Sequence, residues 1–221
     1  MEILYLAYNR LEFTKLSMET MLKNTTLSLV DRVVIYDDGS TDGTLEYLRE
    51  TIKGKPMELR ETSGLGPTGI LRHYVETGAS EMFAKIDNDV MLPPCWLETC
   101  LRIMNEPSID ILGIESMYPS GNGAHVFEPS EYVGGIGMLR TRAFDHCIPR
   151  DHGRFGFTAW QDYHPRIVKG WIKPSLPVCL LNLVPLEPWF SFSRKYVANN
   201  WQRNWPEPYD ESKRSLWKWW A

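Results

Sequence analysis

Two carboxylates separated by one residue form the first cluster in this chain whose types and spacing suggest chemistry. Asp87, Asn88 and Asp89, here called the acidic triplet, come directly after residues 82–86, which have the pattern of a strand. Residues two apart on a strand point to the same side, so the two carboxylates begin on one face. They repel each other unless a cation joins them, and hard divalent ions such as Mn²⁺ or Mg²⁺ prefer oxygen ligands and bridge them to phosphates. The alternative for this pattern taken alone is a solvated acidic loop.

A second polar cluster follows another apolar segment, residues 33–36. It begins with Asp37 and Asp38 and continues into a glycine-containing turn. A carboxylate at the end of a strand does not bind a phosphate directly, but it can accept hydrogen bonds from a ribose or from a base N–H. We therefore expect Asp38 to contact a nucleotide. The turn itself is better explained as a helix start, capped by Thr41 or Asp42.

Short apolar runs alternate with helical patterns through the first half of the chain, and these elements must position the two clusters. Strands are expected at residues 3–6, 33–36, 57–60, 82–86 and 110–114. Helices are expected directly after Asn9, which would cap the first of them, and at 45–52, at 66–77 and from Pro93 to Met104. This alternation predicts βαβ units, and therefore an α/β fold with a mainly parallel sheet flanked by helices. Right-handed crossovers bring the loops that follow the strands to one edge, where ligands bind in such sheets. Three polar strand ends should therefore meet in one crevice: Tyr8-Asn9-Arg10, Asp37-Asp38 and the acidic triplet.

Three motifs, in this order along the chain, resemble those of the GT-A glycosyltransferases and most closely those of glycosyltransferase family 2. Leu6-Ala7-Tyr8-Asn9-Arg10 resembles the family's Pro-Thr-Tyr-Asn-Arg, and Tyr36 to Thr44 resembles its Val-Asp-Asp-Gly-Ser-Thr-Asp-Gly-Thr. The acidic triplet stands where the family has its Asp-x-Asp (DXD) motif. The resemblance covers roughly residues 1 to 110. It implies a Rossmann-like GT-A fold and a hexosyltransferase-like glycosyltransferase, with a nucleotide diphosphate sugar, by family habit UDP-linked, as donor and Mn²⁺ or Mg²⁺ as cofactor.

The resemblance also implies roles for single residues of the donor site. Tyr8 and Asp38 would contact the base or ribose, with Asn9, Arg10 and Asn88 beside them. Asp89 would be the principal metal ligand, and Asp87 a further ligand nearer the ribose or sugar. Arg72, in Leu71-Arg72-His73, corresponds to a family arginine followed by asparagine and would hold the donor phosphate or base.

The second half resembles the family more loosely. Residues 134–139 are similar to a glycine-rich strand beside the acceptor site, where glycine permits close backbone approach to a ligand. Trp160-Gln161-Asp162 corresponds to a family Glu-Asp pair, so Asp162 is the candidate general base and a single base implies inversion at the anomeric carbon. His164 follows as a candidate metal ligand. The alternatives are that Asp162 caps a helix through Ile167 and that His164 is a surface histidine.

Composition limits the location and class of the protein. The chain has 221 residues, 43% of them hydrophobic, and a formal net charge of -4, which disfavours an overall basic nucleic-acid binder. No stretch of about 18 uncharged apolar residues is present, so no transmembrane segment is expected, and the first residues lack the pattern of a signal peptide. The four cysteines form no CxxC pair. We expect reduced thiols and a cytoplasmic protein.

The domain organisation expected from these patterns is one GT-A domain with a C-terminal extension. The domain would span residues 1–190, with a nucleotide-sugar-binding half at 1–115 and an acceptor half at 116–190; the extension would span 191–221. Five of the nine tryptophans lie in residues 201–221, among several Lys and Arg. The extension therefore suits packing on the body, a homo-oligomer contact, or an anionic acceptor or lipid headgroup.

The acceptor is expected to offer a hydroxyl group, on a glycan, a small molecule, a protein or a modified nucleic acid. A nicotinamide dehydrogenase is disfavoured, because the first strand is followed by Ala7-Tyr8-Asn9-Arg10 and not by Gly-x-Gly-x-x-Gly. Two other classes stay open. One is a sugar nucleotidyltransferase, which shares the sheet type, and the other is a non-catalytic protein that binds nucleotide sugars or carbohydrate.

Overall fold

The computed structural model describes residues 1–114, 124–144, 161, 166–174, 176 and 178–180. Its strands are β1 (Glu2–Ala7), β2 (Arg32–Asp37), β3 (Met57–Glu61), β4 (Met82–Asp87), β5 (Val90–Met91), β6 (Ile111–Gly113), β7 (Val126–Pro129), β8 (Gly137–Arg140), β9 (Lys169–Lys173) and β10 (Cys179–Leu180). Its helices are α1 (Leu11–Asn24), α2 (Thr44–Ile52), α3 (Gly66–Glu76) and α4 (Trp96–Met104), with short 3₁₀ helices η1 (Leu27–Leu29) and η2 (Thr141–Phe144). The expected alternation of strands and helices in the first half is confirmed.

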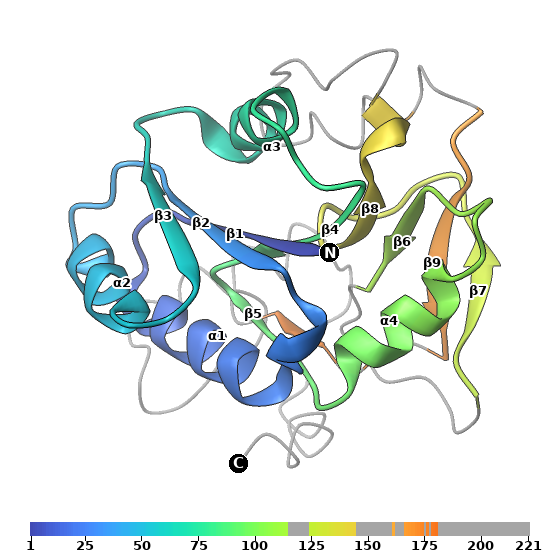
Figure 1. The fold of residues 1–221 in the computed structure, drawn as a ribbon, viewed down its shortest axis with the longest axis horizontal. Coiled ribbons are helices and arrows are strands. Elements are labelled where there is room, and N and C mark those ends of the chain that lie inside the picture. Colours follow the sequence, from blue (N-terminus) through green and yellow to red (C-terminus); the bar gives the residue numbers. More distant parts are fainter. Residues whose placement is uncertain (115–123, 145–160, 162–165, 175, 177, 181–221) are drawn as a thin grey trace, which may run out of the picture.

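The main sheet has eight strands in the order β3-β2-β1-β4-β8-β6-β9-β7 (Figure 1). The four strands β3, β2, β1 and β4 are parallel to one another. β8 then runs antiparallel between β4 and β6, while β6 and β9 are parallel and β7 forms an antiparallel edge. This is the mainly parallel α/β sheet that the sequence predicts, continued by a mixed half. The carboxyl ends of β1, β2 and β4 consequently lie along one edge.

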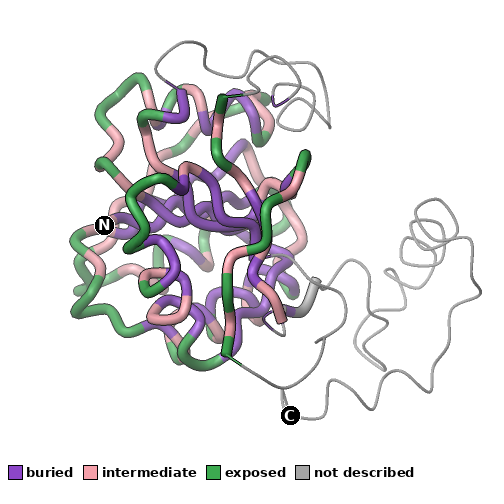
Figure 2. The backbone as a smooth tube through the Cα atoms, turned by 90° about the vertical axis from the view of Figure 1, so that its right-hand side faces the viewer, coloured by how far each residue is buried: buried purple, intermediate pink, exposed green. Residues whose placement is uncertain are grey.

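Alternate residues of the strands enter different cores on the two faces of the sheet. Helices α1, α2 and α4 cover one face, and α3 with η2 covers the other (Figure 1). Along β4, Ala84 and Ile86 join the first core and Phe83 joins the second. The inner strands β1, β2, β4, β6 and β8 form the buried interior of the molecule, with exposed segments around it (Figure 2). Burial on both faces fixes the register of β4, and so the place of the acidic triplet at its end.

The connection from β1 to α1 contains two residues with left-handed backbone, Asn9 (φ 52°) and Arg10 (φ 63°). The expectation that Asn9 caps α1 is wrong, because its side chain is turned toward the loop between β2 and α2 instead. Asp42 takes over the cap: its Oδ2 accepts a hydrogen bond from Leu11 N at 3.0 Å. Its Oδ1 accepts one from Thr44 N at 3.1 Å. One carboxylate therefore serves the first turns of both α1 and α2.

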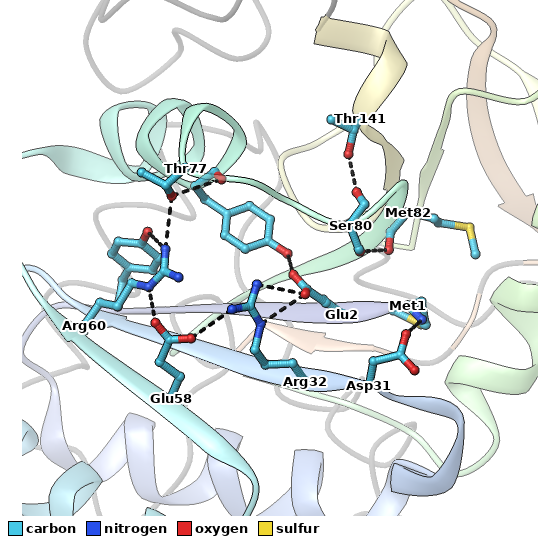
Figure 3. Close-up of polar contacts among 12 residues, drawn as sticks. Met1, Glu2, Asp31, Arg32, Glu58, Arg60, Thr77, Ser80, Met82 and Thr141 are labelled. Atoms are coloured by element: carbon cyan, nitrogen blue, oxygen red, sulfur yellow. Dashed lines mark hydrogen bonds and ion pairs between the residues drawn. The ribbon is translucent and has the colours of Figure 1, made fainter.

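A polar network joins α3 to the first three strands (Figure 3). The Tyr74 hydroxyl donates a hydrogen bond to Glu2, which pairs with Arg32 at 2.8 Å. Arg32 pairs with Glu58 at 3.1 Å, and Glu58 with Arg60 at 2.5 Å. Burial and the neighbouring Glu2 raise the pKa of the Tyr74 hydroxyl, which keeps it a donor. The network crosses β1, β2 and β3 and so ties the edge strand β3 and helix α3 to the centre of the sheet.

The second half differs from the sequence expectation in its details. The glycine-rich segment forms strand β8 only from Gly137 onward. A Cβ atom at Gly137 would lie 2.1 Å from the Leu112 carbonyl oxygen, so this glycine permits the close approach of β6. Gly137 thus makes room for a neighbouring strand, where the prediction was room for a ligand. The short strands β5 and β10 form a separate antiparallel pair, in which Leu180 is opposite Val90. That pair begins directly after Asp89.

Candidate functional site

The ends of β1, β2 and β4 are joined by hydrogen bonds centred on Asn9, so the three polar strand ends meet at one edge of the sheet. Asn9 N donates to Ser40 Oγ at 2.8 Å, and Asn9 Oδ1 accepts from Thr41 N at 2.8 Å. The Asn9 carbonyl accepts from Asn88 Nδ2 at 2.8 Å, and the same nitrogen donates to Thr14 Oγ1 at 2.8 Å. The middle residue of the acidic triplet is therefore held against α1. The Asn88 side-chain nitrogen therefore donates its hydrogen bonds within the protein.

Each carboxylate of the triplet has its own cation. Lys85 Nζ lies 2.6 Å from Asp87 Oδ1, and Arg10 Nη1 lies 2.8 Å from Asp89 Oδ2. Arg10 is among the residues predicted for this site, whereas Lys85 is not. A sequence signal was present, since Lys85 is a charged residue inside an otherwise apolar strand. The structure leaves it only 3% exposed. A lysine so deeply buried is expected to have a paired anion.

Burial raises the pKa of the Asp89 carboxyl, and the charge of Asp87 raises it further. Arg10 and, more weakly, Lys85 act in the opposite direction without cancelling these effects. Asp89 is thus a carboxylate whose charge is only partly compensated by the protein. Such a group gains free energy from an additional cation placed beside it.

A hard divalent cation fits the carboxylate oxygens of the triplet. Over the part of the chain that the structure describes, no group of three or more His, Cys, Asp or Glu side chains is arranged to hold a metal ion. A cation at the triplet would therefore need further oxygen ligands, such as those of a phosphate or water. The expected ligand His164 and the expected base Asp162 both lie outside the described residues.

Asp38, expected to contact a nucleotide, is 7% exposed and accepts hydrogen bonds with both carboxylate oxygens. Oδ1 accepts from Thr62 Oγ1 at 3.0 Å and from Leu65 N at 2.9 Å, and Oδ2 accepts from Gly66 N at 2.8 Å. Asp38 therefore fixes the start of α3 to the end of β2. This support is a structural role beyond the predicted contact with a nucleotide.

Tyr8 and Arg72 are two further residues expected at the donor site. Tyr8 is 58% exposed, so its ring is free to contact a flat ligand. Arg72 is half-buried on α3, the helix whose start Asp38 fixes. Its neighbour His73, where the family has asparagine, is bonded through Nδ1 to the Tyr36 hydroxyl at 2.8 Å. The histidine therefore links α3 to β2.

Gln161 is 2% exposed and forms two hydrogen bonds with one backbone unit. Its Oε1 accepts from Val133 N at 3.1 Å, and its Nε2 donates to Val133 O at 3.0 Å. An ionised glutamate could not donate the second bond, which explains how glutamine is accommodated where the family has glutamate. The residue before Asp162 is thereby anchored to the segment that leads into β8.

The family model described as Glycosyl transferase family 2 matches residues 3–161. TarS of S. aureus, residues 1–349, has a similar fold, with 12% identity and a TM-score of 0.62 over 98% of this chain and 77% of that chain. The mannosyltransferase PcManGT from Pyrobaculum calidifontis, solved with GDP-Man and Mn²⁺, is 15% identical, with a TM-score of 0.51 over 66% of this chain and 45% of that chain. Mth528, a nucleotidyl transferase from Methanothermobacter thermautotroptrophicus, is 12% identical, with a TM-score of 0.56 over 80% and 88%. No curated protein matches the chain significantly.

The sheet order, the helices on its two faces and the solved relatives define the fold as that of the GT-A glycosyltransferases. The family match extends over most of the chain, and this protein belongs to glycosyltransferase family 2. At the identities above, the solved structures establish the fold alone. Within the described ranges, no helix is long and apolar enough to cross a membrane.

Proposed function

We propose that this protein transfers one sugar from a nucleotide diphosphate sugar to an acceptor hydroxyl, with Mn²⁺ or Mg²⁺ as cofactor and with inversion at the anomeric carbon. The observation that carries the proposal is the junction of Asn9, Arg10 and the acidic triplet. Two pairs of residues 79 positions apart, Arg10 with Asp89 and Asn9 with Asn88, each form a hydrogen bond of 2.8 Å there. The junction lies at the sheet edge where α/β folds bind ligands. Family membership supports the same reading.

The donor would lie across the ends of β1, β2 and β4. The exposed Tyr8 ring would stack on the base. Asp38 would hold the start of α3 in place, and Arg72 on that helix would lie near the diphosphate. Arg10 and Arg72 would offset phosphate charge. UDP is the donor nucleotide that the family resemblance favours, and TarS, of similar fold, was solved with UDP-GlcNAc.

Asp89, with Asp87 as the neighbouring carboxylate, would hold the divalent cation, which would supply positive charge to the leaving diphosphate. Asp89 is suited to this role because its burial leaves its charge undercompensated. The acceptor hydroxyl oxygen would attack the anomeric carbon from the side opposite the diphosphate and give its proton to Asp162. The bond from the anomeric carbon to the diphosphate oxygen would break, with the electron pair leaving on the nucleoside diphosphate. A single displacement of this kind inverts the carbon.

The decisive assay incubates the protein with a panel of nucleotide diphosphate sugars and candidate acceptors, with Mn²⁺ or with a chelator. Metal-dependent release of nucleoside diphosphate is the expected result. A thermal-shift panel identifies the donor beforehand, because a ligand that binds only the folded state raises the melting temperature in proportion to its affinity. If no nucleotide sugar stabilises the protein and none is consumed, the proposal is wrong.

Asp162→Asn separates chemistry from binding. Loss of a general base typically slows the chemical step by about 10²- to 10⁴-fold. We therefore expect the turnover of Asp162→Asn to fall by about that factor while its affinity for the donor stays unchanged, measured by steady-state kinetics and by titration calorimetry. Normal turnover in this variant would remove Asp162 from the mechanism and leave the donor site untouched.

A sugar nucleotidyltransferase is the second candidate, because Mth528 shares the fold over 88% of its own length. That reaction would join a nucleotide to a sugar phosphate and release pyrophosphate. Pyrophosphate formed from a nucleoside triphosphate would therefore favour it over the transferase. Nucleotide-sugar binding without either product would instead support a non-catalytic binding protein.

We also propose the division into a donor half at residues 1–115, an acceptor half at 116–190 and an extension at 191–221. The donor half holds every described residue assigned above to the nucleotide sugar. The acceptor, whether glycan, small molecule, protein or modified nucleic acid, would meet the half that contains Asp162. Deleting residues 191–221 tests the role of the extension, because loss of acceptor use and loss of self-association are separate readouts.

A further inference from the structure

The two cations of the acidic triplet are held in unequal ways. Lys85 is part of β4, and its side chain is only 4% exposed. Arg10 lies in the loop after β1, and its side chain is 33% exposed. The Lys85–Asp87 pair therefore joins two positions of one strand, with the ammonium buried and the Asp87 side chain 31% exposed. The Arg10–Asp89 pair joins a loop to a strand end, at the edge of the solvent.

The buried position of Lys85 makes its pairing with Asp87 a lasting one. An ammonium that is removed from water loses more hydration free energy than it regains unless an anion stays beside it. Asp87 Oδ1 supplies that anion at 2.6 Å. A Cβ atom at Gly135 would lie 3.6 Å from Lys85 Nζ, so a residue without a side chain borders the ammonium. Separating the pair would strand a buried charge, whereas Arg10 can exchange Asp89 for water.

We infer that Lys85 is a positioning residue: it neutralises Asp87, fixes its carboxylate, and leaves Asp89 as the carboxylate of the triplet that accepts a divalent cation. Arg10 gives up Asp89 when the cation enters. This inference rests on the metal site of the proposed function, and it changes one part of it. Asp87 belongs to the protein's internal charge balance and is not a second metal ligand.

The test is a set of Mn²⁺ titrations without nucleotide, in which the electron paramagnetic resonance signal of the free ion measures how much Mn²⁺ is unbound. Wild type is compared with Lys85→Met, Asp87→Asn and the double variant. Lys85→Met frees a carboxylate beside Asp89, so its Mn²⁺ affinity should rise by about tenfold, as added ligand charge does in oxygen-ligand sites. Asp87→Asn leaves an unpaired cation near the site and should weaken binding. The double variant removes a neutral pair and should bind Mn²⁺ within about threefold of wild type, since an internally compensated pair contributes little net field.

The double variant decides between the two assignments of Asp87. If it binds Mn²⁺ about tenfold or more weakly than wild type, Asp87 is a metal ligand and the inference is overturned. The same holds if Lys85→Met leaves the affinity unchanged, or if Mn²⁺ binds to none of the variants. Should Lys85→Met fail to fold by circular dichroism, the double variant still gives the answer, because it contains no stranded charge.

Lys15→Met is the matched control, because Lys15 pairs with Glu12 at 2.7 Å on the exposed surface of α1. It removes the same charge and breaks a pair of similar length, and it should leave Mn²⁺ affinity unchanged. Binding of UDP-sugars is measured separately. If the Mn²⁺ pattern is as expected but no nucleotide sugar binds, the proposed function fails and the role of Lys85 stands.

Discussion

The carboxyl groups of Asp42 and Asp89 are shifted in opposite directions by their surroundings. Partial burial acts to raise the pKa of Asp42, but hydrogen bonds from Thr44, Leu11 and Arg10 outweigh it, and the pKa is lowered. At Asp89, burial and the neighbouring Asp87 raise the pKa. The first carboxylate therefore stabilises the fold when ionised. The second is ionised at a cost in stability, which is the usual condition of a group kept for binding.

Asp89→Asn should stabilise the protein at neutral pH by on the order of 1 kcal/mol. The folded state holds the Asp89 proton more tightly than the unfolded chain, so the ionised carboxylate lowers stability as pH rises from 3.8 through the raised folded pKa. Asparagine removes that loss. Chemical unfolding measured at pH 7 and at pH 3.5 should show the gain at the higher pH alone. A variant less stable than wild type at pH 7 would show that Arg10 compensates Asp89 fully.

Asp42→Ala should have the opposite effect, because the carboxylate caps two helices. Loss of a side-chain cap costs about 1 kcal/mol. The lowered pKa means that this stabilisation is present above pH 3.8 and is lost as pH falls through the folded pKa. Unfolding curves of variant and wild type should therefore converge in acid. Asp42→Asn, which keeps an acceptor oxygen, should fall between the two; equal losses for both variants would indicate a charge effect without capping.

At the scale of elements, the structure separates glycines that look alike in the sequence. Gly135 and Gly137 belong to the same glycine-rich segment, yet a Cβ atom would meet Lys85 Nζ at 3.6 Å at the first and Leu112 O at 2.1 Å at the second. The first distance is an ordinary contact. The second is closer than atoms can approach, so β8 and β6 would have to separate.

Gly137→Ala should therefore destabilise the protein by about 3 kcal/mol, the upper part of the range for overpacked sites. Gly135→Ala is the matched control and should cost much less. Thermal unfolding of both variants measures the difference. If the two melting temperatures fall equally, the contact between β8 and β6 is not what requires glycine at position 137.

The elements of the first half could be predicted from sequence because each has a clear apolar period and a turn at its end. The two-residue strand β5 could not, since a pair of residues has no period. The start of β8 was placed too early because glycine gives no side-chain pattern from which to read a register. Asn9 was expected to cap α1, because asparagine is common at helix caps. Asparagine is also enriched in left-handed backbone, and this second preference determines the role of Asn9 here.

At the scale of the whole molecule, the fold and the meeting of three strand ends followed from the order of elements, whereas the partners of the charges did not. Lys85 and Asp87 are close in sequence, yet their pairing depends on how deeply β4 is buried, which needs the packing of both faces. The support that Asp38 gives α3 depends on the loop at Thr62, which has no motif of its own. Tertiary contacts of this kind leave no periodic signal.

The sheet also predicts a gradient of local stability. β1 and β4 have neighbours on both sides and lie between two cores, whereas β3 and β7 are edges with exposed residues. Backbone amides of β1 and β4 should exchange hydrogen at the slowest rates and those of β7 at rates several orders of magnitude faster, because exchange follows the free energy of local opening. Hydrogen-exchange mass spectrometry measures this. Uniform exchange across the sheet would contradict the gradient.

The pairing of β5 with β10 connects the acidic triplet to a segment far along the chain. Val90 follows Asp89 directly, and its backbone is held in register by Leu180. The position of the carboxylate proposed to bind the cation therefore depends on two strands that lie far apart in the sequence, β4 and β10.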